Sequence, residues 1–127
     1  QNERGVVGVL VELGGVDTND AKAREVAHDI ALHIASAVPR YVSRDDVPAD
    51  EVERERGILE AQTKEEGKPE QAWPKIIEGK LNGFFKTVTL LEQSFVKDQK
   101  TTIRQLVSGL GGDATVRRFA RVKIGEE

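Results

Sequence analysis

The chain has 127 residues, a length that favours a single domain with room for a small appendage. It contains no cysteine, which excludes disulfides, thiolate catalysis and cysteine-ligated zinc. The formal net charge of −3 argues against a nucleic-acid binder, and no apolar run is long enough to span a membrane. The chain begins at Gln1, shows no signal peptide and lacks methionine, so we expect a piece of a longer, cytoplasmic protein.

The N-terminal third favours a strand followed by a helix. Residues 5–13 form a nearly continuous run of β-branched and other apolar side chains, which predicts a strand buried on both faces. Residues 20–38 then repeat apolar side chains at helical spacing, with Asp20 among the candidate capping residues and Pro39 as the stop. The predicted core stripe of this helix consists of Ala23, Val26, Ala27, Ile30, Ile34 and Ala37.

The middle of the chain predicts an antiparallel helical hairpin. Residues 49–66 are rich in Glu and Arg and carry few apolar side chains, which is typical of a mostly solvated helix. A Gly67-Lys68-Pro69 turn follows, and the next helix begins near Pro74. Its apolar side chains form a heptad-like seam of Ile77, Leu81, Phe84, Val88 and Leu91. Such a seam is usually core, although it also suits a partner helix.

The last third predicts a short connection over residues 94–98, a short helix over 101–107 and a strand over 115–124. The pattern at residues 117–119 is irregular, which indicates a β-bulge. Strands at both ends of the chain, with helices between them, predict an α+β fold. We expect a small antiparallel sheet packed on helices, with an inserted antiparallel helical hairpin.

Two constellations have the residue types of a catalytic or metal site. Asp29, His33 and Ser36 share a helix face, but no oxyanion hole or positioned turn accompanies them. We therefore interpret Asp29 and His33 as a surface ion pair or a partner contact. His28 and His33 are five residues apart and point in different directions on a helix, so no shared metal is expected. We expect neither an enzyme nor a cofactor.

A third constellation is the basic final strand, which carries Arg117, Arg118, Arg121 and Lys123. One interpretation is an RNA- or ribosome-binding module that uses these charges, and the other is a solvated edge strand protected by them. The acidity of the whole chain favours the second interpretation. The glycine-rich residues 109–112 lack the Lys-Ser/Thr of a phosphate loop and indicate a helix-ending turn instead.

Five segments resemble the motifs of one family, in the same order and spacing. They are DIALHIAS with PRYV at 29–42 (family IAMHIAA…P.Y), VP with VERER at 47–56 (VP…V..ER), GKP with KIIEGKL at 67–81 (GKP…KIVEGRL), LEQSFVKD at 91–98 (LLEQPFVKD) and FARVKIGE at 119–126 (RF.RFEVGE). The chain thereby resembles bacterial elongation factor Ts, although Ser94 stands where the family usually has proline.

The resemblance implies a guanine-nucleotide exchange factor that binds elongation factor Tu and promotes GDP release. It covers only the C-terminal half of the family's core domain together with its hairpin. The N-terminal helical domain and the half that carries the family's TDFV stretch have no counterpart here. We therefore expect a module that binds elongation factor Tu but exchanges nucleotide poorly. The family's first strand of this subdomain should precede Gln1, so an open sheet edge is expected.

The resemblance also assigns a division and candidate sites. Residues 1–47 and 94–127 would be the two parts of the core subdomain, and residues 48–93 the hairpin insertion. The expected partner-binding residues are His33, Ser36, Pro39, Tyr41 and Val42. The expected hairpin residues, which would also serve homodimerisation, are Val52, Leu59, Ile77, Leu81, Phe84 and Val88. No direct contact with nucleic acid or membrane is expected.

Overall fold

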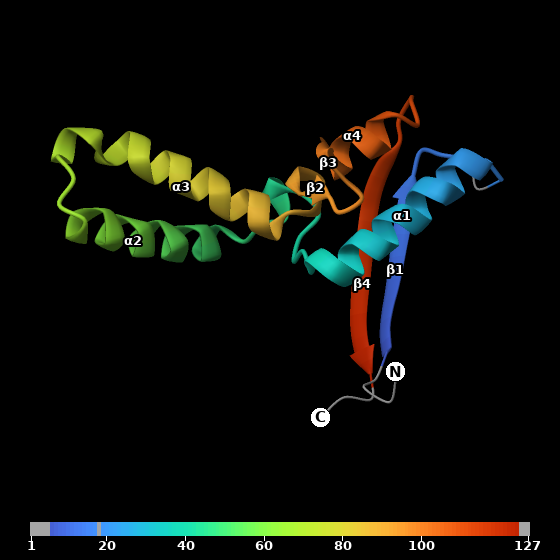
Figure 1. The fold of residues 1–127 in the computed structure, drawn as a ribbon, viewed down its shortest axis with the longest axis horizontal. Helices are drawn as coiled ribbons and strands as arrows, with labels where there is room; N and C mark the ends of the chain where they lie inside the picture. The colour runs from blue at the N-terminus through green and yellow to red at the C-terminus, as the bar shows by residue number, and fades with distance from the viewer. Residues whose placement is uncertain (1–5, 18, 125–127) are drawn as a thin grey trace.

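The computed structural model describes residues 6–17 and 19–124 and confirms the α+β class (Figure 1). Its main elements in chain order are β1 (Val6–Gly14), α1 (Ala21–Ala37), α2 (Ala49–Glu65), α3 (Trp73–Val88), β2 (Ser94–Phe95), β3 (Asp98–Thr102), α4 (Ile103–Ser108) and β4 (Thr115–Ile124). Three single 3-10 turns lie between them, η2 (Arg44–Asp46), η3 (Glu70–Ala72) and η4 (Leu90–Glu92). Over the described ranges, none of the helices is long and apolar enough to cross a bilayer.

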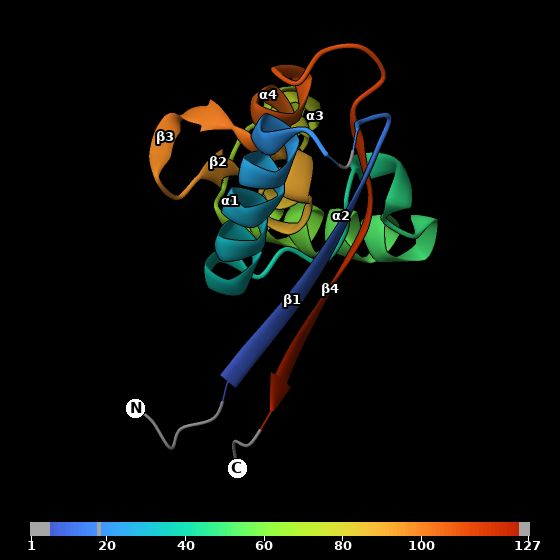
Figure 2. The same cartoon turned by 90° about the vertical axis from the view of Figure 1, so that its right-hand side faces the viewer.

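The two terminal strands pair with each other. β1 and β4 lie side by side and form an antiparallel ladder (Figure 2). The register shifts between Glu12, which faces Arg118, and Leu13, which faces Val116. Arg117 is therefore the additional residue of a β-bulge, as the irregular pattern predicts. β2 and β3 form a second small ladder, so the prediction of a plain connection over residues 94–98 is wrong.

The β1–β4 ladder is apolar on both faces but covered on only one. α1 packs against β1, and Val9, Val11 and Phe119 contact the core from the covered face. On the opposite face Leu10 is 76% exposed and Val122 is 52% exposed. The prediction that β1 is buried on both faces is therefore wrong, because a continuous apolar run does not show whether a second layer exists.

The core lies where α1, α4 and β4 converge. Its buried members are Val26, Ile30, Ile34, Leu90, Phe95, Ile103, Val107 and Val116. Ile30, Ile34 and Ile103 are completely inaccessible to solvent, and burial of each stabilises the fold by about 1.5–3 kcal/mol. Asp20 caps α1 by accepting a hydrogen bond from the Lys22 amide, as its position before the helix predicts.

α2 and α3 form the predicted antiparallel hairpin, which projects from the body of the molecule (Figure 1). Leu59, Ile77 and Leu81 make its small buried cluster. The turn is fixed by the indole Nε1 of Trp73, which donates to the carbonyl of Lys68 at 2.8 Å. The functional division at residues 47/48 and 93/94 stays a prediction.

A candidate docking edge at the end of helix α1

The end of α1 carries an unusual backbone conformation. Val38 has φ 51° and ψ 56°, in the left-handed region, and its amide donates to the carbonyl of Ile34 at 3.0 Å. Glycine or asparagine is preferred at this position, and a β-branched residue there is strained by about 1–2 kcal/mol. The Val38 side chain is 49% exposed, so burial in this chain does not compensate the strain.

The residues after Val38 are held by backbone hydrogen bonds from the end of the hairpin. The amides of Arg40 and Tyr41 both donate to the carbonyl of Val88, at 2.9 and 3.0 Å. In return, the amides of Leu90 and Leu91 donate to the carbonyls of Tyr41 and Val42. Residues 40–42 and 88–91 thus run side by side and fix the path of the chain between α1 and the hairpin.

His33 anchors this region from inside. The ring is completely buried, and its Nδ1 accepts a hydrogen bond of 3.2 Å from the Val96 amide. The proton therefore resides on Nε2, which donates to the side-chain oxygen of Gln93 at 2.8 Å. Gln93 in turn donates to the carbonyl of Thr87 at 2.7 Å. Burial lowers the pKa of His33, and the hydrogen bond to Gln93 opposes that shift only in part.

The interpretation of Asp29 and His33 as a surface ion pair is wrong. Asp29 pairs instead with Lys97 at 3.2 Å, and both ring nitrogens of His33 are occupied by groups about sixty residues away in sequence. Neither residue is placed to activate Ser36 as a nucleophile. Within the part of the chain that the structure describes, no cluster of three or more acidic and histidine side chains could hold a metal ion.

We name the surface formed by Leu32, Ser36, Val38 and residues 40–42 the α1 edge. Of the five residues predicted to contact a partner, Ser36 is exposed, Tyr41 and Val42 are half-buried, and Pro39 and His33 are buried. His33 can therefore contribute only by positioning its neighbours. Two apolar residues that the sequence analysis missed, Leu32 and Val38, are 44% and 49% exposed. The sequence already indicates their exposure, because both apolar side chains lie outside the predicted core stripe of the helix.

The hydroxyl of Tyr41 ties the α1 edge to the first turn of α2. It donates to the carboxylate of Glu51, and this hydrogen bond is the main reason that the pKa of Tyr41 is raised. The guanidinium of Arg40 pairs with the same carboxylate at 2.7 Å and lies 5.3 Å from the centre of the Tyr41 ring. The edge therefore has an apolar part at Leu32 and Val38 and a charged part at Arg40.

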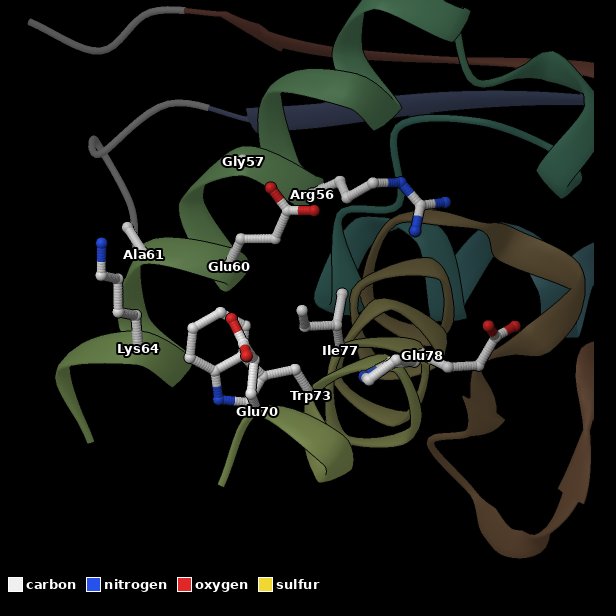
Figure 3. A pocket seen from close by; sticks show the side chains of 10 residues that line it. Arg56, Gly57, Glu60, Ala61, Lys64, Glu70, Trp73, Ile77 and Glu78 are labelled. Carbon is white, nitrogen blue, oxygen red and sulfur yellow. The ribbon is translucent and has the colours of Figure 1, made fainter. Parts of the chain in front are cut away.

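Five of the six predicted hairpin residues pack together inside the chain. Leu59, Ile77 and Leu81 are buried against Val52 and Phe84, and Val88 is buried at the base. Their use in homodimerisation stays a prediction. An open groove of about 690 Å³ lies between α2 and α3 near the turn. Figure 3 shows Trp73 and Ile77 in this groove, with Glu60 and Lys64 on its rim.

In the basic strand, Arg117, Arg118 and Arg121 each have a partner inside the chain. Arg117 and Arg118 both pair with Glu12 across the bulge, at 3.7 and 2.5 Å. Arg121 is half-buried and donates to the carbonyl of Ala35 at the end of α1, at 3.2 Å. These contacts favour the interpretation of a solvated edge strand over that of an RNA-binding surface.

The fold and the α1 edge define an α+β module with a projecting helical hairpin. The family model described as Elongation factor TS matches residues 2–126, and the chain belongs to the elongation factor Ts family. It is 59% identical over 120 residues to elongation factor Ts of Thermobifida fusca (strain YX), covering 94% of this chain and 40% of that protein. The corresponding protein of Mycobacterium avium (strain 104) is 53% identical over 120 residues, covering 94% of this chain and 42% of that protein. The chain therefore spans about two fifths of the length of these relatives.

Proposed function

We propose that this chain is the module of an elongation factor Ts that binds elongation factor Tu in the cytoplasm, without itself catalysing a covalent reaction. The family match over nearly the whole chain is the observation that carries the proposal. Within the chain, the α1 edge is the surface assigned to the partner. A strained, exposed valine at its centre supports this assignment, because strained residues that serve no internal contact often belong to binding surfaces.

Exchange of nucleotide is assigned to the larger protein. An exchange factor and a nucleotide that bind the same GTPase weaken each other's binding reciprocally. A module that binds the GTPase without disturbing its nucleotide site therefore does not accelerate GDP release. This chain corresponds to about 40% of its relatives. We expect it to hold elongation factor Tu while leaving the rate of GDP release close to the spontaneous rate.

The decisive experiment is calorimetric titration of the chain into GDP-bound elongation factor Tu. Saturable binding is expected, and Val38→Gly is expected to weaken it about tenfold through loss of an apolar contact. The same substitution relieves backbone strain, so the variant should melt no lower than the parent chain. Ile58→Ala, on the exposed side of α2, is the control and should bind normally.

Three results would contradict the proposal at different points. Absence of binding by a chain that melts cooperatively would remove elongation factor Tu as the partner. Equal affinities of the Val38→Gly variant and the parent would show that the α1 edge is not the binding surface. Full acceleration of GDP release by the chain alone would show that this module both binds elongation factor Tu and exchanges its nucleotide.

We assign homodimerisation, the second partner expected from the resemblance, to the open groove of the hairpin. The α2 wall carries Arg56 and Lys64 with Glu60 between them, whereas the facing side carries Glu70, in the turn η3, and Glu78, in α3. Arg56 and Lys64 are eight residues apart, about 12 Å along α2, so the groove of one hairpin could place these cations near Glu70 and Glu78 of a second hairpin. Ala61→Arg in the groove should then abolish a dimer seen by sedimentation velocity, and Ile58→Arg should not. A parent chain that sediments as a monomer at high concentration would refute this assignment.

A further inference from the structure

The body and the hairpin have separate apolar clusters, and the neck between them combines the buried Val47, Val88 and Leu90 with several polar contacts. Leu59, Ile77 and Leu81 form the hairpin cluster, which shares no residue with the cluster of the body. Backbone hydrogen bonds between residues 40–42 and 88–91 join the two chain segments of the neck. These bonds fix where the two segments meet.

One arginine reaches across the neck to three groups. Arg44 lies just before α2, and two of its guanidinium nitrogens donate to the two oxygens of Glu92, which lies beyond the end of α3. A third nitrogen donates to the side-chain oxygen of Asn82 at 3.1 Å. The guanidinium also lies 4.7 Å from the centre of the Phe85 ring. Asn82 and Phe85 are three residues apart on α3, so the arginine contacts a single face of that helix.

A second tie holds the other helix. Glu51, in the first turn of α2, accepts the Tyr41 hydroxyl and pairs with Arg40. Each helix of the hairpin is thus fastened near its base by one polar tie, α3 through Arg44 and α2 through Glu51. Because one tie holds each helix, the two ties together set the angle between the hairpin and the body.

Both ties are reachable by solvent. The Arg44 side chain is 43% exposed and Glu92 is 14% exposed, while Arg40 is 54% and Glu51 16% exposed. Ion pairs of this exposure are weakened by salt, since the screening length falls from about 10 Å at 0.1 M to about 3 Å at 1 M. The direction of the hairpin consequently depends on contacts that a change of medium or one substitution can release.

We propose that Arg44 is a salt-sensitive latch that fixes the direction of the α2–α3 hairpin relative to the body, and that the hairpin swings about the neck when this latch opens. α3 has 16 residues, so the arm is about 24 Å long, and a swing of about 15° moves its tip by about 6 Å. A movement of this size is measurable between two labels.

The chain suits such a measurement because it has no native cysteine. We would place one spin label at Gln71→Cys near the tip and one at Ser108→Cys on the body, both at exposed positions. Pulsed electron resonance then gives the distribution of distances between the labels. The parent should show a narrow distribution in 0.05 M salt, and Arg44→Gln should widen it at least twofold or shift its centre by several ångströms.

The matched control is Lys80→Gln. It removes the Lys80–Glu66 ion pair of 3.2 Å, which has comparable exposure but lies wholly within the hairpin. This variant should leave the distribution unchanged. Arg44→Lys keeps the charge but cannot form the two-nitrogen fork or stack on Phe85, so it should resemble Arg44→Gln. Tyr41→Phe, which removes the hydroxyl from the second tie with little loss of packing, should widen the distribution as well.

Salt provides an independent test on the same samples. Raising NaCl to 1 M should widen the distribution of the parent toward that of Arg44→Gln and widen the distribution of that variant less, since only the tie through Glu51 remains in it. The latch is refuted if the parent and Arg44→Gln give the same distribution while circular dichroism shows equal helix content. Equal widening by Lys80→Gln would also refute it, because the motion would then be fraying within the hairpin.

Discussion

The body and the hairpin are stabilised in different ways. The body draws eight buried apolar residues from segments between Val26 and Val116, whereas the hairpin cluster has three residues from two adjacent helices. Contacts between distant segments form late and make unfolding cooperative, while contacts between neighbours form early and break locally. We therefore expect the body to unfold cooperatively and the hairpin to open independently of it.

The largest expected effect tests the body. Ile34→Ala removes a completely buried side chain from the centre of the core. It should lower the free energy of unfolding by about 2–5 kcal/mol, because the lost transfer energy adds to the cost of a cavity. Urea denaturation followed by circular dichroism measures this loss. Leu32→Ala, on the exposed side of the same helix, should cost less than about 1 kcal/mol.

The second effect tests the independence of the hairpin. Leu81→Ala removes a residue that is 5% exposed in the smaller cluster, and we expect about 2–3 kcal/mol of local destabilisation. Native-state hydrogen exchange should show faster exchange in α2 and α3, with protection of α1 and α4 retained. Equal loss of protection in both regions would show that body and hairpin unfold as one unit.

The third effect joins the two regions through His33. Replacement by alanine should cost about 1–3 kcal/mol, because the buried side chain of Gln93 and the partly buried Val96 amide would lose their partner. Burial holds the pKa of His33 in the folded chain below its ordinary 6.5, so the unfolded chain binds more protons just below that pH. This contribution is complete above about pH 6.5 and is lost as the pH falls through the folded pKa.

Urea denaturation between pH 7.5 and 5 measures this dependence. The non-titrating variant His33→Gln should lose the part of the slope that begins at pH 6.5. An identical profile for the parent and this variant would show that His33 is not the group responsible.

The smallest effect should have the opposite sign. Gly79 and Gly83 lie inside α3, and a methyl group added at either position would meet no atom within 4 Å. Gly79→Ala and Gly83→Ala should each stabilise the hairpin by about 0.5–1 kcal/mol, since alanine restricts the unfolded chain. Slower exchange confined to α2 and α3 would confirm the gain and its location. A loss of stability in either variant would mean that the glycine is needed for helix geometry.

The helices could be predicted from the sequence because their signals are local. Asp20 precedes α1 and Pro39 follows it, and the seam of Ile77 and Leu81 identifies α3 with its facing partner. The β2–β3 ladder could not be predicted, since Ser94 pairs with Thr102 and Phe95 with Asp98 without any alternation of apolar residues. Local pattern thus determines the helices well and the short ladder poorly.

The candidate site could be predicted only in part. The motifs indicated the segment around Ser36 and Tyr41, but the burial of His33 depends on Gln93, sixty residues further along the chain. Arg44 gave no signal at all, because its partners Asn82, Phe85 and Glu92 come together only in the folded neck. Contacts between elements that are far apart in sequence are the part that pattern cannot supply.

The β-bulge at Arg117 has a consequence for changes in chain length. Side chains of a regular strand alternate between faces, so Val116 and Phe119, three residues apart, could not both face the core without an extra residue. The bulge supplies that residue. A deletion of Arg117 would leave Val116 opposite Leu13 and Arg118 opposite Glu12, with every remaining side chain on its present face. β4 thus contains one residue, Arg117, that can be deleted without moving any core side chain of the strand to the opposite face.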